Sequence, residues 1–156
     1  MIEAITLKNF KSFTDATLRL GNLTFLIGTN ASGKSNIRDA FRFIHGISRG
    51  YTLAEIIGEK WIEGGVQQWT GIRGGLREAC YRNGGQTNNQ FTIGVKVSLP
   101  GDKPATADYS ISVNVGDKGR PAYVTSEHLV ITGRGKFVFD THPDGKEASG
   151  TKDPRM

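Results

Sequence analysis

The stretch Gly28-Thr-Asn-Ala-Ser-Gly-Lys-Ser35 matches the pattern G-x-x-x-x-G-K-[ST] at every fixed position. Gly28 and Gly33 allow the backbone to curl so that successive N–H groups point inward, and a side chain at either position would obstruct that curl. Lys34 adds a positive charge, and the Ser35 hydroxyl is a hard oxygen ligand of the kind that Mg²⁺ takes. The stretch is therefore predicted to be a P-loop, a cradle for the phosphates of a nucleotide.

The residues on both sides of this loop favour the same prediction. Residues 23–27, Leu-Thr-Phe-Leu-Ile, are nearly all apolar, which is typical of a strand buried on both faces. Beyond Ser35 the apolar residues recur with a helical period and predict a helix over residues 35–47. A helix that begins at the loop adds the partial positive charge of its N-terminus. The sequence thus predicts a strand, a phosphate loop and a helix in the order that a P-loop needs.

The remainder of the chain divides by its pattern. Strands are predicted at residues 2–7 and 16–20, and a short helix is predicted within 52–60. Residues 64–90 are rich in glycine and are expected to be mostly loop, with a candidate helical turn near residues 76–81. Residues 91–139 alternate between apolar and polar and predict an antiparallel meander.

Length and composition bound the interpretation. The 156 residues are the size of one domain, with residues 1–140 as the folded lobe and residues 141–156 as a polar tail expected to be disordered. The net charge of +5 is compatible with nucleotide or nucleic acid partners, and equally with an ordinary solvated surface. Cys80 is the only cysteine, so it is assigned a structural role in a reducing cytoplasm. No window approaches 18 apolar residues, so no membrane segment is expected.

Four blocks of the sequence carry a family resemblance, which extends over roughly residues 1–135. They are residues 5–13 (ITLKNFKSF), 23–36 (LTFLIGTNASGKSN), 39–43 (DAFRF) and 71–79 (GIRGGLREA). With these blocks the chain resembles the N-terminal lobe of an ABC-type ATPase head of the SMC/RecF-like group, which includes predicted bacterial AAA-family ATPases. The resemblance implies an α/β P-loop NTPase fold, lobe one, with a mixed or antiparallel β-meander after the P-loop helix.

The resemblance also implies a ligand, a metal and the residues that hold them. ATP and Mg²⁺ are the expected cofactors, with Ser35 as a magnesium ligand. The residues expected around the nucleotide are Gly28, Thr29, Asn30, Ala31, Ser32, Gly33, Lys34, Ser35, Asn36, Lys11 and Ser12. A glutamine that senses the γ-phosphate and Mg²⁺ is expected downstream of the helix. Gln67 and Gln68 are candidates by their order along the chain, Gln68 as a second metal ligand, and Gln86 and Gln90 remain open.

Other parts of such a head have no counterpart in the sequence. A signature loop resembling Leu-Ser-Gly-Gly is absent, and the stretch Phe137-Val-Phe-Asp140 resembles a Walker B strand but carries Thr141 where the catalytic base should be. We interpret this stretch as the last strand of the meander. His45, His128 and His142 show no partner spacing. The chain therefore resembles a lobe cut off before the signature loop and Walker B, whose expected partner is a second head or the missing C-terminal lobe, in a homodimer or a partner chain.

Three functions are compatible with these observations. The first is the ATP- and Mg²⁺-binding N-terminal portion of an ATPase that acts in DNA repair, chromosome maintenance or phage defence, with DNA as a further partner. The second is a non-catalytic nucleotide-binding or interaction module that needs a partner for hydrolysis. The third is another P-loop class: GTPase motifs are absent, but Arg73, Arg77 and Arg82 keep a small kinase with an arginine-bearing lid in consideration.

Overall fold

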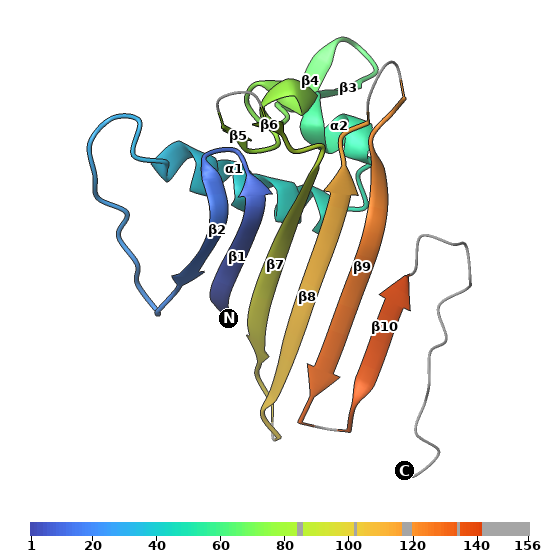
Figure 1. The fold of residues 1–156 in the computed structure, drawn as a ribbon. Coiled ribbons are helices and arrows are strands. Elements are labelled where there is room, and N and C mark those ends of the chain that lie inside the picture. The colour runs from blue at the N-terminus through green and yellow to red at the C-terminus, as the bar shows by residue number, and fades with distance from the viewer. Residues whose placement is uncertain (84–85, 102, 117–119, 134, 142–156) are drawn as a thin grey trace.

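The computed structural model describes residues 1–141 except 84–85, 102, 117–119 and 134. Its main element is a six-stranded antiparallel sheet in the order β10-β9-β8-β7-β1-β2 (Figure 1). The strands of this sheet are β1 (Ile2–Phe10), β2 (Phe13–Arg19), β7 (Gln90–Leu99), β8 (Ala105–Asn114), β9 (Tyr123–Thr132) and β10 (Phe137–Thr141).

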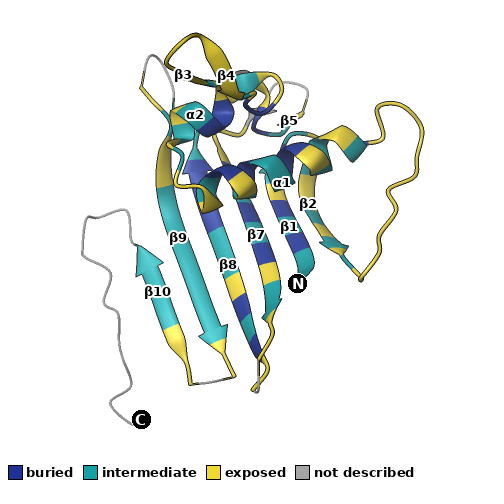
Figure 2. Ribbon diagram, turned by 180° about the vertical axis from the view of Figure 1, so that it is seen from behind, coloured by how far each residue is buried: buried dark blue, intermediate teal, exposed yellow. Residues whose placement is uncertain are grey.

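The helices lie on one face of this sheet and at one end of it. Helix α1 (Lys34–Ser48) crosses the sheet on that face, and the short α2 (Leu53–Ile57) follows it (Figure 2). The residues between α2 and β7 form a 3₁₀ turn and four short strands. These are η1 (Gly75–Glu78), the pair β3 (Lys60–Ile62) and β4 (Val66–Trp69), and the pair β5 (Arg82–Asn83) and β6 (Gln86–Thr87). Within the described residues, no helix has the length and apolar character needed to span a membrane.

The core lies between the sheet and the helices. Phe91, Ile93 and Val95 alternate along β7 on the buried face, as expected for a sheet with one face on the core and one toward water. Phe91 is the centre of an aromatic cluster, with ring centroids 5.2 Å from Phe10 and 5.4 Å from Phe43 of α1. The face of α1 that carries Phe43 is thereby fixed on the middle of the sheet.

Most elements match the sequence pattern. The helix predicted over residues 35–47 is observed as α1, and the alternation of residues 91–139 is observed as an antiparallel series of strands. The candidate helical turn near residues 76–81 overlaps the observed η1. The glycine-rich residues 64–90 also contain β4, β5, β6 and the first residue of β7, which is more structure than the expected loop. The predicted disordered tail falls, beyond Thr141, outside the described residues.

The strand predicted at residues 23–27 is wrong for this structure. The segment is extended but belongs to no strand, and in Figure 1 it lies in the long loop that stands away from the sheet between β2 and α1. Leu23, Phe25 and Ile27 are 74%, 75% and 93% exposed. A strand needs a neighbour for its backbone N–H and C=O groups, and the described part of the chain places none beside this segment. None of the six strands of the main sheet contains residues 23–27, so the sheet does not hold the strand expected before the P-loop.

The exposure of Ile27 leads to a prediction about stability. Truncation of Ile27 to Ala should change the free energy of unfolding by less than about 0.5 kcal/mol, because its side chain is already in water. The same truncation at Ile93, which is fully buried, should lower it by about 2 to 5 kcal/mol. Urea unfolding of the two variants measures the difference. A large loss for Ile27→Ala would show that residues 23–27 are packed in the chain alone.

Candidate nucleotide-binding site

The loop before α1 has the backbone that its glycines predict. Gly33 is the N-cap of α1 with φ 91°, a left-handed conformation that favours glycine. A Cβ on Gly28 would lie 2.7 Å from the Ser32 hydroxyl oxygen. Ala31 also has a positive φ, 64°, which is uncommon for a residue with a side chain. Residues 28–33 therefore hold a tight curl that ends at the first residue of the helix.

The N–H groups of this curl are available to a ligand. The Ser32 N–H donates to the Thr29 carbonyl at 3.4 Å, a long hydrogen bond. The N–H groups of Asn36 and Ile37 donate to the Gly33 carbonyl, but among the described residues no acceptor is found for five N–H groups before them, and no side chain caps α1. These donors belong to Asn30, Ala31, Gly33, Lys34 and Ser35. Unpaired N–H groups at the positive end of a helix form an anion-binding site.

The side chain of Lys34 folds back onto the curl. Its Nζ donates to the carbonyls of Gly28 at 2.5 Å and Thr29 at 2.6 Å, and lies 3.2 Å from the Ser32 hydroxyl. The ammonium group is thus held at the loop by acceptors that belong to the loop itself. Ser35 lies exposed on the first turn of α1, so its hydroxyl is open to water. The donor set, one ammonium, one exposed hydroxyl and several N–H groups, suits a polyphosphate with Mg²⁺.

The turn between β1 and β2 packs against this curl. Lys11 and Ser12 connect Phe10 to Phe13, and Lys11 adopts φ 51°. The Ser12 hydroxyl oxygen accepts a hydrogen bond from Asn36 Nδ2 at 2.8 Å. A Cβ placed on Gly33 would come within 3.0 Å of the Phe13 ring and 3.4 Å of the Ser12 hydroxyl oxygen. Glycine at position 33 is therefore required both by its φ and by the close approach of this turn.

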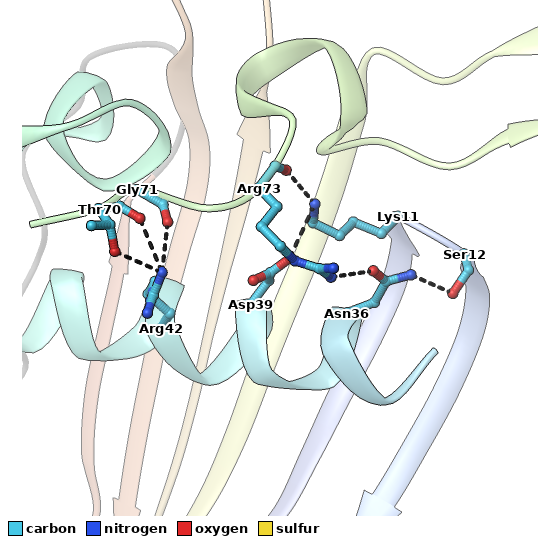
Figure 3. Close-up of polar contacts among 8 residues, drawn as sticks. All are labelled: Lys11, Ser12, Asn36, Asp39, Arg42, Thr70, Gly71 and Arg73. Atoms are coloured by element: carbon cyan, nitrogen blue, oxygen red, sulfur yellow. Dashed lines mark hydrogen bonds and ion pairs between the residues drawn. The ribbon is translucent and has the colours of Figure 1, made fainter. Parts of the chain in front are cut away.

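A buried carboxylate on α1 joins this helix to the turn between β1 and β2 (Figure 3). Asp39 is fully buried, and its Oδ2 lies 3.2 Å from Lys11 Nζ and 3.0 Å from Arg73 Nη2. Arg73 Nε donates to the same oxygen at 3.0 Å, and Lys11 Nζ also donates to the Arg73 carbonyl at 2.5 Å. A buried carboxylate needs such partners, because the desolvation of an unpaired charge costs several kcal/mol.

This cluster changes the interpretation of Lys11. The sequence resemblance predicts Lys11 among the nucleotide-binding residues, and the structure does bring its backbone beside the loop. Its side chain, however, is only 5% exposed and points into the protein at Asp39. Lys11 therefore stabilises the turn beside the site through its ion pair with Asp39, while Ser12, Asn36 and the loop residues lie at the surface of the site.

A second set of contacts fixes the segment that carries Arg73. Arg42, one turn after Asp39 on α1, donates through Nη1 to the carbonyls of Thr70 at 3.0 Å and Gly71 at 3.1 Å (Figure 3). A Cβ on Gly71 would lie 1.5 Å from the Gly58 carbonyl oxygen, so only glycine fits there. Residues 70–73 are thereby tied along α1. The helical period shows Asp39 and Arg42 off the apolar stripe but cannot reveal partners that lie about 30 residues away in sequence.

The glutamines occupy other places. Gln67 and Gln68 lie in β4, exposed, and line an open groove of about 760 Å³ along α1 with residues that run from Arg38 to Ser48. This groove extends toward the C-terminal end of α1, away from the curl. Gln86 lies in β6 and Gln90 begins β7. The structure thus shows no contact of Gln68 with Ser35, and its role as a metal ligand stays a prediction.

The stretch that resembles a Walker B strand lies in β10, at the opposite edge of the sheet from β2. Asp140 is across from His128 on β9, with its Oδ2 3.6 Å from His128 Nδ1. This position agrees with the interpretation of the stretch as the last strand of the meander. His45 packs against Trp69 at 5.5 Å between ring centroids, and His142 is outside the described residues.

Cys80 lies in the core near the end of β1. It forms an isolated bridge with Phe10 and is buried. Burial raises the pKa of the Cys80 thiol to about 11, although the charge of Arg82 lowers it in part. At neutral pH the thiol is therefore protonated, as the assignment of a structural role to this cysteine requires.

Comparison with known proteins supports the resemblance found in the sequence. Residues 1–70, which include the curl and α1, match the model of the AAA ATPase domain family. The chain is similar to the chromosome partition protein Smc of Methanocaldococcus jannaschii, 29% identical over 136 residues, which are 83% of this chain and 11% of that protein. The Smc of Methylococcus capsulatus is 44% identical over 63 residues, 36% of this chain and 5% of that protein. The Smc of Clostridium kluyveri is 47% identical over 47 residues, 29% of this chain and 4% of that protein.

These relatives are much longer than the chain, which spans about a tenth of their length or less. The matches support an ATPase of the SMC-like type, as the sequence resemblance predicts. The two shorter matches have the higher identity, so the similarity is concentrated in part of the chain.

The buried Asp39 leads to a prediction about stability. Asp39→Leu should lower the free energy of unfolding by about 3 to 5 kcal/mol, because it leaves the buried Lys11 ammonium without its counter-charge. The double variant Lys11→Met with Asp39→Leu should recover most of this loss, since both charges are removed together. The exposed Asp15 of β2 offers a matched control, and Asp15→Leu should stay within about 0.5 kcal/mol of the wild type. Urea unfolding measures all four proteins, and equal losses in the single and double variants would contradict the ion pair.

Proposed function

We propose that this chain, which carries the N-terminal part of an SMC/RecF-like AAA ATPase, binds ATP together with Mg²⁺ at residues 28–35. The observation that supports this most directly is a set of N–H groups at the N-terminus of α1 that have no acceptor among the described residues, those of Asn30, Ala31, Gly33, Lys34 and Ser35. N–H groups at a helix N-terminus that no protein group accepts are free to donate to an anion, and Lys34 beside them adds a positive charge.

Each part of the curl has a distinct task in this proposal. The N–H groups donate to the phosphate oxygens, and Lys34 turns from the loop carbonyls to the phosphates and neutralises part of their charge. The exposed Ser35 hydroxyl would hold magnesium, which when bound neutralises charge on the β- and γ-phosphates. Ser12 and Asn36 border the curl through their own hydrogen bond and so shape its side.

A phosphate cradle and a metal ligand bind a nucleotide but do not complete its hydrolysis. Phosphoryl transfer to water also needs a group that positions the attacking water. Residues 23–27 are apolar, β-forming and exposed, so they lack the neighbouring strand that such a segment needs. This supports the proposal that another lobe or chain packs against them and completes the catalytic site. We propose a C-terminal lobe or a second head as that neighbour.

Because nucleotide binding and hydrolysis need different groups, a second function is compatible with the same site. If the chain works without such a neighbour, it acts as a nucleotide-binding module without catalysis of its own. ATP hydrolysis that appears only when a partner is added would support the first function, and ATP binding with no turnover in any combination would support the second.

A role in DNA repair, chromosome maintenance or phage defence is the biological setting that we propose. Its support is the similarity to proteins named for chromosome partition and the net charge of +5. DNA is the partner that this setting suggests.

If the chain contacts DNA phosphates, its affinity for a duplex in a gel-shift series should fall steeply as salt rises from about 50 to 200 mM, because bound counterions are released. Affinity that does not respond to salt would contradict this partner.

The ATP proposal leads to a prediction about Lys34. Lys34→Ala should weaken binding of Mg-ATP by on the order of 100-fold or more, since it removes a side-chain cation held directly at the curl. The exposed Lys8 of β1 gives a control of equal charge, and Lys8→Ala should leave ATP affinity within about twofold. Titration calorimetry measures the affinities, and circular dichroism checks that each variant remains folded.

Two results would overturn this proposal. Equal ATP affinity in wild type and Lys34→Ala would separate the binding from the curl. A strong preference for GTP over ATP in competition, or phosphate transfer to a small acceptor, would favour another P-loop class instead.

A further inference from the structure

We infer that Arg73 is a positioning residue for the ATP site, and that it acts through Asn36 to make the Ser12 hydroxyl a hydrogen-bond donor toward the phosphates. This inference rests on the proposed function and assigns a new role within it. Arg73 does not lie in the curl. It comes from the segment that follows β4, and it reaches the curl through a relay of side chains (Figure 3).

The relay consists of two hydrogen bonds in sequence. Arg73 Nη2 donates to Asn36 Oδ1 at 3.1 Å. Asn36 Nδ2 then donates to the Ser12 hydroxyl oxygen at 2.8 Å. Asn36 directly follows Ser35 on α1, and the Ser12 oxygen lies 3.4 Å from the position of a Cβ on Gly33. The relay thus ends against the curl itself.

The direction of these bonds decides what Ser12 can do. An arginine only donates, so the asparagine oxygen must face Arg73 and its NH₂ group must face Ser12. Ser12 is therefore an acceptor in this bond, and the proton of its hydroxyl stays available for another acceptor. Ser12 is exposed beside the curl, where a phosphate oxygen is the acceptor that our proposal supplies.

The bonds of Arg73 to Asp39 fix the position of the guanidinium that begins the relay. The Arg73 side chain is 47% exposed, yet Nε and Nη2 both bond the fully buried Asp39 carboxylate, each at 3.0 Å. One planar guanidinium thereby binds the carboxylate and Asn36 together, which a lysine ammonium on a flexible stem does not reproduce. The backbone of residue 73 is held separately, because Lys11 Nζ donates to its carbonyl.

This geometry separates the positioning role from a structural one. Arg73→Lys keeps a cation beside Asp39, and the Lys11 bond keeps the backbone in place, so the thermal midpoint should stay close to that of the wild type. The fork to Asn36 is lost, so affinity for Mg-ATP should fall by about fivefold or more. If Arg73 served only the fold, the Arg73→Lys variant would keep the Mg-ATP affinity of the wild type as well as its thermal midpoint.

The experiment is a double-mutant cycle on the chain, with Mg-ATP affinity and thermal midpoint measured for each protein. The variants are Arg73→Lys, Arg73→Ala, Asn36→Ala and the double variant Arg73→Ala with Asn36→Ala. Because Arg73 acts through Asn36, the double variant should bind Mg-ATP no more weakly than Asn36→Ala alone. Arg19→Ala, an exposed arginine at the far end of β2, controls for the loss of one charge.

The outcomes distinguish this inference from the function on which it rests. If the wild type binds Mg-ATP and Lys34→Ala does not, the proposed function stands. Additive losses in the cycle, or an Arg73→Lys variant with wild-type affinity, would then overturn the role of Arg73 alone. If the wild type does not bind Mg-ATP, both the function and this inference are overturned.

Discussion

The burial of the Asp39 carboxylate is the constraint on which the site depends. A carboxylate without exposure must be paired, and here its partners come from two distant places, the turn after β1 and the segment after β4. Lys11 adopts a positive φ at that turn, and its side chain reaches inward to Asp39. As a result, three elements that are far apart in sequence meet at the first two turns of α1, which directly follow the curl.

The packing of α1 on the sheet adds the second half of this constraint. Phe43 rests on Phe91, and Arg42 binds the carbonyls of residues 70 and 71, so the helix is fixed along its length. A helix that cannot shift presents its N-terminal N–H groups in a constant direction, which is what an anion site needs. The curl is thus held ready while the apolar residues 23–27 before it remain in water.

Local patterns were sufficient for most of the fold. The helical period gave α1, and the alternation of Phe91, Ile93 and Val95 gave the one-sided sheet, because both depend on which face of an element is buried. The strand at residues 23–27 could not be judged in the same way, since a strand exists only with a neighbour and the pattern does not say where that neighbour is. The sequence marks Arg73 only as one of several arginines, because it does not show the bonds to Asp39 and Asn36, which lie 34 and 37 positions away along the chain. For the candidate site, the motif located the curl from the sequence alone, and the support beneath it needed three dimensions.

In the proposed function, the N–H groups of residues 29–35 receive the phosphates of ATP. The most direct measurement is a titration of the ¹⁵N-labelled chain with Mg-ATP, followed by the amide signals in two-dimensional NMR. The largest shifts are expected on residues 29–35 and on Asn36 and Ser12, with small changes in β8 and β9 toward the other edge of the sheet. Shifts that are absent from residues 29–35, or that gather in the groove beside Gln67 and Trp69 instead, would contradict the proposed function.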